Sequence, residues 1–135
     1  MNKFKNSVSK RQQGFSLVEL LIVMVIIGLL ASLVGPAMFG KLDSSKVNTA
    51  EAQMDLLATA LDTYRLDVGQ YPESLQGLRV SDDKRWDGPY LPKDVPMDPW
   101  DNPYEYKRTS EGFELSSLGR DGKEGGTDID ADIIY

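Results

Sequence analysis

Residues 10–40 read KRQQGFSLVELLIVMVIIGLLASLVGPAMFG, a short basic segment followed by a long apolar run. From Leu20 to Gly40 the chain carries no charged residue for 21 positions. As an α-helix that rises ~1.5 Å per residue, this run spans about 30 Å, the thickness of the hydrocarbon core of a membrane. Basic residues precede the run and none follows it until Lys41, so the positive-inside rule predicts a cytoplasmic N-terminus.

One carboxylate, that of Glu19, lies at the start of this apolar run. A charge at the centre of a membrane helix costs about 2.5 to 3.5 kcal/mol on insertion scales, so an acid there usually has a partner or a role. The plainer alternative is that Glu19 lies near the membrane surface and stays hydrated. A cleavable secretory signal is disfavoured, because Gly35-Pro36-Ala37 is a poor cleavage site, and a plain anchor has no need of Glu19.

The apolar pattern continues beyond the predicted membrane segment. Apolar residues recur at alternating spacings of three and four, at Val47, Ala50, Met54, Leu57, Leu61, Tyr64 and Val68. This spacing is typical of one face of an amphipathic helix. Gly69 and Pro72 predict its end, so a single helix from Phe15 to about Asp67 would be roughly 80 Å long. Within it, Gly35-Pro36 predicts a tolerated kink, and a site of helix melting is the alternative.

The composition excludes several classes of function. The 135 residues contain neither cysteine nor histidine, which removes disulfides, thiolate and imidazole metal sites, and His-dependent nucleophilic catalysis. We therefore expect one modest globular unit that is not an enzyme. Without the four basic residues of positions 1–14, 11 basic residues face 21 acidic ones, a formal charge of −10. This acidity argues against nucleic-acid binding.

The C-terminal half contains a proline-rich segment. Five of the seven prolines fall between Pro89 and Pro103, interleaved with Tyr90, Trp100 and Tyr104. Such a segment is neither a helix nor a central strand. We expect an irregular loop whose rings cover the amphipathic helix, with a polyproline ligand or a sugar-binding platform as alternatives.

Two segments that follow this loop alternate apolar and polar residues. They are YEYKR at 104–108 and FELSS at 113–117, separated by the four residues 109–112. This pattern predicts a β-hairpin with a four-residue loop. The expected fold class is therefore α+β, with a long helix packed on a small antiparallel sheet and a loop-rich flank.

The segment LGRDGKEGGTDIDAD at 118–132 combines glycines with acids. After Asp121 come Glu124, Asp128, Asp130 and Asp132, and Lys123 is the basic residue among them. The residues alone leave two interpretations, a solvated acidic tail and a calcium site. Ca²⁺ takes about 6 to 8 oxygen ligands of this kind, whereas Mg²⁺ demands a tight octahedron and keeps its waters. The spacing does not match the EF-hand pattern.

The sequence KRQQ followed by Gly14, Phe15 and Glu19 resembles the leader of type IV prepilins. The resemblance implies that a membrane peptidase cuts between Gly14 and Phe15 and methylates the new amino group of Phe15. Glu19 then corresponds to the signature glutamate of the family, five positions into the mature chain. A free α-amine, with a pKa of about 7.7 to 8.0, is largely cationic at neutral pH, so it is a natural partner for Glu19 of a neighbouring subunit.

Within that family, the C-terminal part is similar to the major pseudopilins of the type II secretion system. The likeness rests on GQYP at 69–72, QGL at 76–78, GPYL at 88–91, DPW at 98–100, NPY at 102–104, SLG at 117–119 and DG at 121–122. Two departures are Trp86-Asp87 before Gly88 and an end at Ile133-Ile134-Tyr135, where an Asn-Trp pair commonly follows. The second departure leaves the length of the last strand open.

The resemblance implies a type IV pilin-like fold in four parts: a cleaved leader at 1–14, a transmembrane and assembly helix at 15–40, the amphipathic half of the helix at 41–68 and a periplasmic globular part at 69–135. It implies a subunit anchored in the bacterial inner membrane that polymerises with itself into a periplasmic pseudopilus for protein export. Its further partners would be minor pseudopilins, an inner-membrane assembly platform and a prepilin peptidase. A pilin of a surface type IV pilus and a monomeric, membrane-anchored calcium-binding domain are the alternatives.

The resemblance also implies one calcium ion in the glycine-rich loop. Carried onto this sequence, its ligands are the carboxylates of Asp121, Asp130 and Asp132 and the backbone carbonyls of Leu118 and Lys123. Glu124 and Asp128 lie where loops of the family differ in length, so the resemblance does not assign them.

Overall fold

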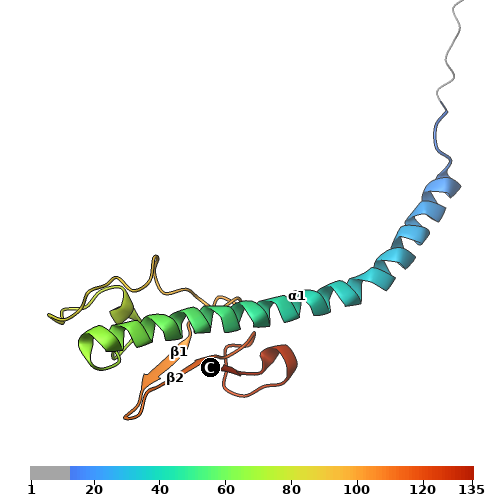
Figure 1. The fold of residues 1–135 in the computed structure, drawn as a ribbon. Helices are drawn as coiled ribbons and strands as arrows, with labels where there is room; N and C mark the ends of the chain where they lie inside the picture. The colour runs from blue at the N-terminus through green and yellow to red at the C-terminus, as the bar shows by residue number, and fades with distance from the viewer. Residues whose placement is uncertain (1–12) are drawn as a thin grey trace, which may run out of the picture. The chain divides into compact units, whose positions relative to one another are not determined.

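The computed structural model describes residues 13–135, so the basic residues Lys3, Lys5, Lys10 and Arg11 lie outside the described part of the chain. The chain divides into two compact units, Met1–Phe39 and Gly40–Tyr135. The described residues form an α-helix, two 3₁₀ helices (η) and three strands. They are α1 (Leu17–Val68), η1 (Leu75–Leu78), β1 (Glu105–Arg108), β2 (Phe113–Ser117), η2 (Asp128–Asp130) and β3 (Ile133–Ile134). Figure 1 labels α1, β1 and β2.

The part of α1 in the first unit is apolar on every side. It is long and apolar enough to cross a membrane. Large side chains such as Leu17 and Leu33 are 76% and 78% exposed. A helix that is apolar all round requires lipid or other helices around it. Pro36 lies inside the helix, which continues through it as predicted.

The part of α1 in the second unit is amphipathic. Its buried residues are Ala50, Met54, Leu57, Ala58, Ala60, Leu61, Tyr64 and Val68. Polar residues between them, such as Glu51 and Asp62, face solvent. The helix ends at Gly69, which adopts a φ of 91° and donates its N–H to the Arg65 carbonyl at 2.8 Å. A left-handed glycine is a common C-terminal stop, and the predicted end is confirmed.

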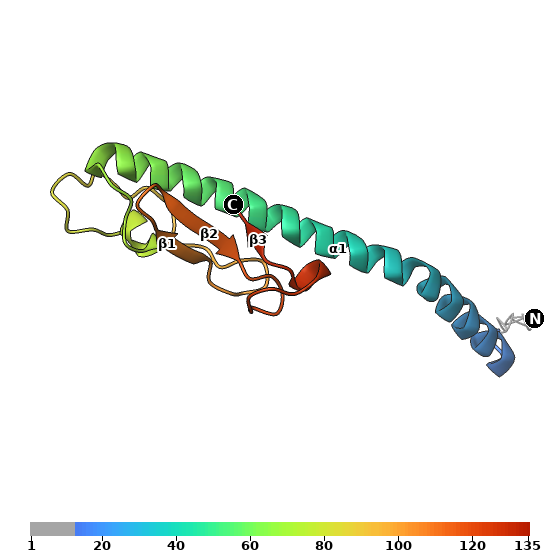
Figure 2. The same ribbon diagram turned by 90° about the horizontal axis from the view of Figure 1, so that it is seen from below.

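The three strands form one antiparallel sheet in the order β1-β2-β3. In the predicted hairpin, Tyr106 pairs with Leu115, and the loop closes through the Thr109 N–H, which donates to the Gly112 carbonyl at 2.9 Å. The last strand, β3, is two residues long and places Ile133 beside Ser117. Figure 2 shows the three strands beside the C-terminal half of α1. The predicted α+β fold and the hairpin are confirmed.

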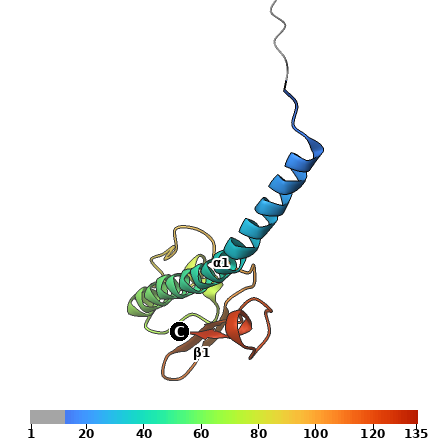
Figure 3. The same ribbon diagram turned by 90° about the vertical axis from the view of Figure 1, so that its right-hand side faces the viewer.

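The proline-rich segment forms neither helix nor strand between residues 89 and 103. Tyr90 and Tyr104 cover the helix as expected, whereas Trp100 is not among the residues packed against the core. Tyr90 packs edge-on against Tyr64, with ring centres 5.6 Å apart. Tyr104 is buried, and its hydroxyl bonds to the Gln53 side chain of α1. Figure 3 shows the preceding yellow segment on one side of the helix and the orange strands on another. The core of this unit therefore lies around the amphipathic half of α1, enclosed by loop and sheet.

Candidate functional site

The start of α1 holds the predicted cleavage and assembly residues. Gly14 and Phe15 lie just before the helix, and the Phe15 side chain is 82% exposed. Ser16 and Glu19 form a reciprocal cap: the Ser16 N–H donates to Glu19 Oε2 at 3.1 Å, and the Glu19 N–H donates to Ser16 Oγ at 3.1 Å. This capping box satisfies two backbone donors that an apolar environment would leave unpaired. The Glu19 carboxylate thus has a local partner, which the Ser-x-x-Glu spacing could have revealed and which we did not predict.

The glycine-rich loop begins where β2 ends and runs to β3. At its neck, Gly119 has a φ of 69°, and a side chain there would come within 2.8 Å of the Ala131 carbonyl oxygen. Only glycine allows this backbone to lie directly against residues 130 and 131. The Arg120 N–H donates to the Ile129 carbonyl at 3.1 Å, which closes the neck. The loop is thereby a defined turn, and its acids have fixed neighbours.

The three predicted carboxylate ligands have different partners. Asp121 Oδ1 accepts the Lys123 N–H at 3.1 Å, and Asp132 Oδ2 accepts the Gly125 N–H at 3.0 Å. Asp132 Oδ1 is buried and has no hydrogen-bond partner within residues 13–135. Both oxygens of Asp130 accept hydrogen bonds from the Arg120 guanidinium, at 2.8 and 2.9 Å. Across residues 13–135, the structure has no group of three or more acidic, histidine or cysteine side chains arranged to hold a metal ion.

A hollow of about 590 Å³ lies on the outer face of the sheet beside this loop. Among the residues that line it are Leu118, Glu124 and Asp132, together with Glu114 of β2. The structure therefore brings two of the predicted ligands, Leu118 and Asp132, to one cavity. Glu124, which the sequence left unassigned, joins them there, whereas Asp121 and Asp130 are not among its lining residues.

A buried carboxylate links the loop to the proline-rich segment. Asp98 is 2% exposed and accepts hydrogen bonds from the Trp100 N–H at 3.0 Å, the Asn102 N–H at 2.8 Å and the Ser117 hydroxyl at 2.7 Å. Asn102 Nδ2 donates to the Gly119 carbonyl at 3.1 Å. Sequence reasoning missed this network, although Asp98 and Asn102 lie in the quoted DPW and NPY motifs. The network holds the neck of the glycine-rich loop in place.

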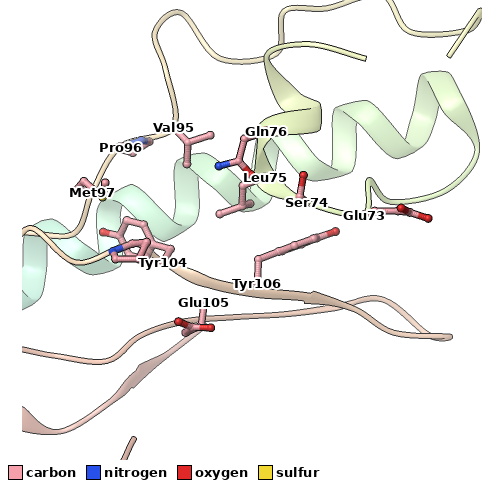
Figure 4. A pocket seen from close by; sticks show the side chains of 11 residues that line it. Glu73, Ser74, Leu75, Gln76, Val95, Pro96, Met97, Tyr104, Glu105 and Tyr106 are labelled. Carbon is pink, nitrogen blue, oxygen red and sulfur yellow. The ribbon is translucent and has the colours of Figure 1, made fainter. Parts of the chain in front are cut away.

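A second hollow, of about 250 Å³, lies between η1, the segment around Val95 and β1. Figure 4 shows Tyr104 and Tyr106 on the side of Leu75, and Glu105 on the opposite side of the strand. This alternation follows the period of a strand. The Tyr106 hydroxyl donates to the Pro72 carbonyl at 2.7 Å, which ties β1 to the segment after the helix.

Comparison with known proteins decides the family. A family model described as type II secretion system (T2SS), protein G, matches residues 37–135, and one described as a prokaryotic N-terminal methylation motif matches residues 9–35. The chain belongs to the type II secretion system protein G family. The predicted resemblance is confirmed across nearly the whole chain.

Curated relatives carry the same family name. The type II secretion system core protein G of Pseudomonas aeruginosa is 43% identical over 134 residues, covering 92% of this chain and 94% of the relative. That of Xanthomonas campestris pv. campestris is 39% identical, covering 92% and 90%. The crystal structure of the major pseudopilin from the type 2 secretion system of enterohaemorrhagic Escherichia coli matches with a TM-score of 0.56 and 26% identity, covering 71% of this chain and 90% of that chain.

Membership of the protein G family identifies the chain as a subunit of the type II secretion pseudopilus with a type IV pilin-like fold. Such a subunit assembles with copies of itself and with other components of the secretion system. The apolar helix and the methylation motif fit a protein that is anchored in the inner membrane.

Proposed function

We propose that the chain is processed and oriented as its leader indicates. A prepilin peptidase cuts between Gly14 and Phe15 on the cytoplasmic side and methylates Phe15, and residues 41–135 lie in the periplasm. The support is the match of the methylation motif to residues 9–35, together with the exposed, non-helical position of Gly14 and Phe15 just before α1. In this orientation the capped end of α1 lies at the cytoplasmic surface of the membrane.

The mature subunit polymerises into a helical homopolymer that drives export of folded proteins across the outer membrane. One observation carries this proposal: the apolar half of α1 exposes large side chains on every side, so it requires lipid in the monomer and neighbouring helices in a filament. Glu19 of one subunit pairs with the methylated amine of the next. Minor pseudopilins and an inner-membrane assembly platform are the proposed partners, and the role of the chain is structural rather than catalytic.

Processing is tested on Gly14→Ala in cells that contain a prepilin peptidase and the secretion components. We expect the variant to be cut less well or not at all, and to give correspondingly fewer pili in electron micrographs, because the peptidase requires a small and flexible residue before the cut and alanine lacks the backbone freedom of glycine. Gly28→Ala is the matched control for cleavage, since it makes the same change away from the cut and nothing in the single chain lies within 4 Å of its added Cβ. A normal methyl-Phe15 terminus in Gly14→Ala, measured by mass spectrometry, would refute the proposed cleavage site.

We further propose that the glycine-rich loop binds one calcium ion. A buried carboxylate oxygen without a partner is costly, and Asp132 Oδ1 is such an atom, beside a hollow also lined by Leu118. A hard divalent cation is the natural partner of that oxygen. The candidate ligands are the carboxylates of Asp121, Asp130 and Asp132 and the carbonyls of Leu118 and Lys123. When bound, calcium would neutralise part of the acidic charge of the loop.

Calcium binding is tested on the full-length chain in detergent micelles. Trp86 and Trp100 are the only tryptophans and both lie in the second unit, so intrinsic fluorescence reports the unfolding of that unit. Saturation at a hundredfold excess over Kd stabilises by about 2.7 kcal/mol, so the melting temperature should rise with Ca²⁺ and less with Mg²⁺. Asp121→Ala should abolish the rise. An unchanged melting temperature in EDTA, with no calcium uptake by calorimetry, would leave the loop as an acidic tail.

A further inference from the structure

Two acids of the glycine-rich loop, Asp130 and Glu124, have opposite surroundings. Asp130 is held by Arg120 through both of its carboxylate oxygens, in a two-point pair with distances of 2.8 and 2.9 Å. The side chain of Glu124 makes no ion pair among the described residues and lines the hollow beside Asp132. The two acids therefore differ in how available they are to a cation.

The position of Asp130 is fixed by more than its ion pair. Its backbone N–H donates to the Thr127 carbonyl at 3.0 Å, and its own carbonyl lies against Gly119, where a Cβ would come within 3.0 Å. The Arg120 guanidinium is always charged, because arginine does not lose its proton in proteins. A divalent cation that approached this carboxylate would meet a fixed positive charge and oxygens that already accept hydrogen bonds.

The hollow beside Asp132, unlike the surroundings of Asp130, has more acidic than basic residues in its lining. Its lining includes the acids Glu105, Glu114, Glu124 and Asp132, with Lys107 as the basic residue among the lining residues. Asp132 also carries a buried carboxylate oxygen, Oδ1, that has no hydrogen-bond partner among the described residues. The Gly125 N–H donates to the other oxygen of Asp132. Gly125 follows Glu124 in the chain, so this hydrogen bond holds the backbone beside Glu124 against Asp132.

We propose that Arg120 withholds Asp130 from the metal and that Glu124 takes its place as a ligand beside Asp132. This inference rests on the proposed calcium site and changes its membership. Arg120 then acts as a permanent counter-ion that keeps the neck of the loop closed whether or not calcium is bound. The cation then neutralises Glu124 and Asp132, which form no ion pair with a basic side chain of the loop.

Glu124→Gln and Asp130→Asn form a matched pair for the test. Each variant removes one negative charge from the same loop, so their general electrostatic effects are alike and a difference between them reports direct ligation. Calcium affinity is measured by calorimetry on the full-length chain in detergent, after removal of divalent cations. We expect Glu124→Gln to weaken binding by about tenfold or more, and Asp130→Asn to remain within about threefold of the wild type.

The reverse order, with Asp130→Asn losing calcium and Glu124→Gln keeping it, would overturn this inference and leave the calcium proposal intact. Absence of calcium uptake by the wild-type chain would overturn both. If Asp130→Asn does not fold, Arg120→Met removes the same ion pair and leaves the Asp130 carboxylate in place. Calcium affinity equal to or above that of the wild type in Arg120→Met supports the inference, and a loss of binding in this variant contradicts it.

Discussion

Asp98 shows how a single residue joins two parts of the second unit. Its buried carboxylate accepts three hydrogen bonds, two from its own turn and one from Ser117 of β2. The Ser117 hydroxyl in turn accepts the Gly119 N–H at 3.3 Å. A carboxylate in the interior is tolerable only when donors replace the lost water, and here the donors come from both sides of the junction.

Asp98→Ala should destabilise the second unit by about 3 kcal/mol or more, because it leaves buried donors without an acceptor. The measurement is the denaturant midpoint of tryptophan fluorescence. Asp94→Ala is the matched control: its side chain is 99% exposed and its contact with Arg79 is 3.6 Å long. The control should change stability by less than about 0.5 kcal/mol. Equal losses in the two variants would contradict the role assigned to Asp98.

Tyr106 makes the second unit less stable as the pH becomes alkaline. Burial raises the pKa of its hydroxyl from the ordinary value of 10 to about 12. Since the folded-state pKa lies above the unfolded value, this contribution to stability is complete below pH 10 and is lost as the pH rises through 12. Burial shifts the pKa of Tyr104 in the same direction.

Tyr106→Phe should therefore flatten the fall in stability above about pH 10, because it removes the proton that the unfolded chain loses first. At neutral pH the variant should be less stable by about 1 kcal/mol, through loss of the hydrogen bond to Pro72. The measurement is the denaturant midpoint at a series of pH values from neutral to alkaline. A variant whose midpoint falls as steeply as that of the wild type would rule out Tyr106 as the titrating group.

At the scale of elements, α1 is one helix with two kinds of environment. Leu61 is 0% exposed against the core, whereas Leu66, five positions later in the same element, is 84% exposed. Both residues are leucine and have the same intrinsic helix propensity. A difference in how much each side chain contributes to stability therefore comes from packing. The amphipathic half is therefore held in place by the sheet and loops rather than by its own helical tendency.

Leu61→Ala should lower the stability of the second unit by about 2 to 5 kcal/mol, through lost burial and the cavity left behind. Leu66→Ala makes the same chemical change on the exposed face and should alter stability by less than about 0.5 kcal/mol. Thermal melting of the detergent-solubilised chain distinguishes them. A large loss in Leu66→Ala would show that an unidentified contact covers this face in the isolated subunit.

At the scale of the whole molecule, Glu19 has two roles, one within its own chain and one in the proposed filament. In the single chain its carboxylate caps the helix through Ser16, and in the proposed filament it neutralises the amine of a neighbouring Phe15. The two roles differ in what they require: a cap needs an acceptor, whereas the pairing needs a negative charge.

Glu19→Leu should insert into the membrane readily yet give few filaments, since it leaves a neighbouring amine unpaired at a cost of several kcal/mol. Glu19→Gln retains an acceptor for the Ser16 N–H and removes the charge, so it isolates the pairing. We expect both variants to be processed normally and to assemble poorly, as counted in electron micrographs. Wild-type filament yield in Glu19→Gln would assign the residue to capping alone.

The sequence by itself was sufficient for the long helix and the hairpin, but not for the two 3₁₀ helices or the extent of β3. The charge-free run of 21 residues, the spacing from Val47 to Val68 and the stop at Gly69 predicted α1 to within two residues at each end. The alternation around 109–112 predicted the hairpin. These patterns are local, because the 3.6-residue period of a helix and the two-residue period of a strand can be read from a short stretch of sequence. The prepilin-like leader and the C-terminal motifs predicted the family for the same reason.

Only the tertiary structure decided which polar groups meet. Three pairs of residues that are distant in the sequence meet in the structure. Arg120 forms an ion pair with Asp130, and Ser117 donates a buried hydrogen bond to Asp98. Glu124 and Asp132 line the same cavity. The acidic pattern of the loop does not distinguish a carboxylate held by arginine from one left free. That distinction depends on the left-handed backbone at Gly119, which brings the two ends of the loop together and so selects the neighbours of each charge.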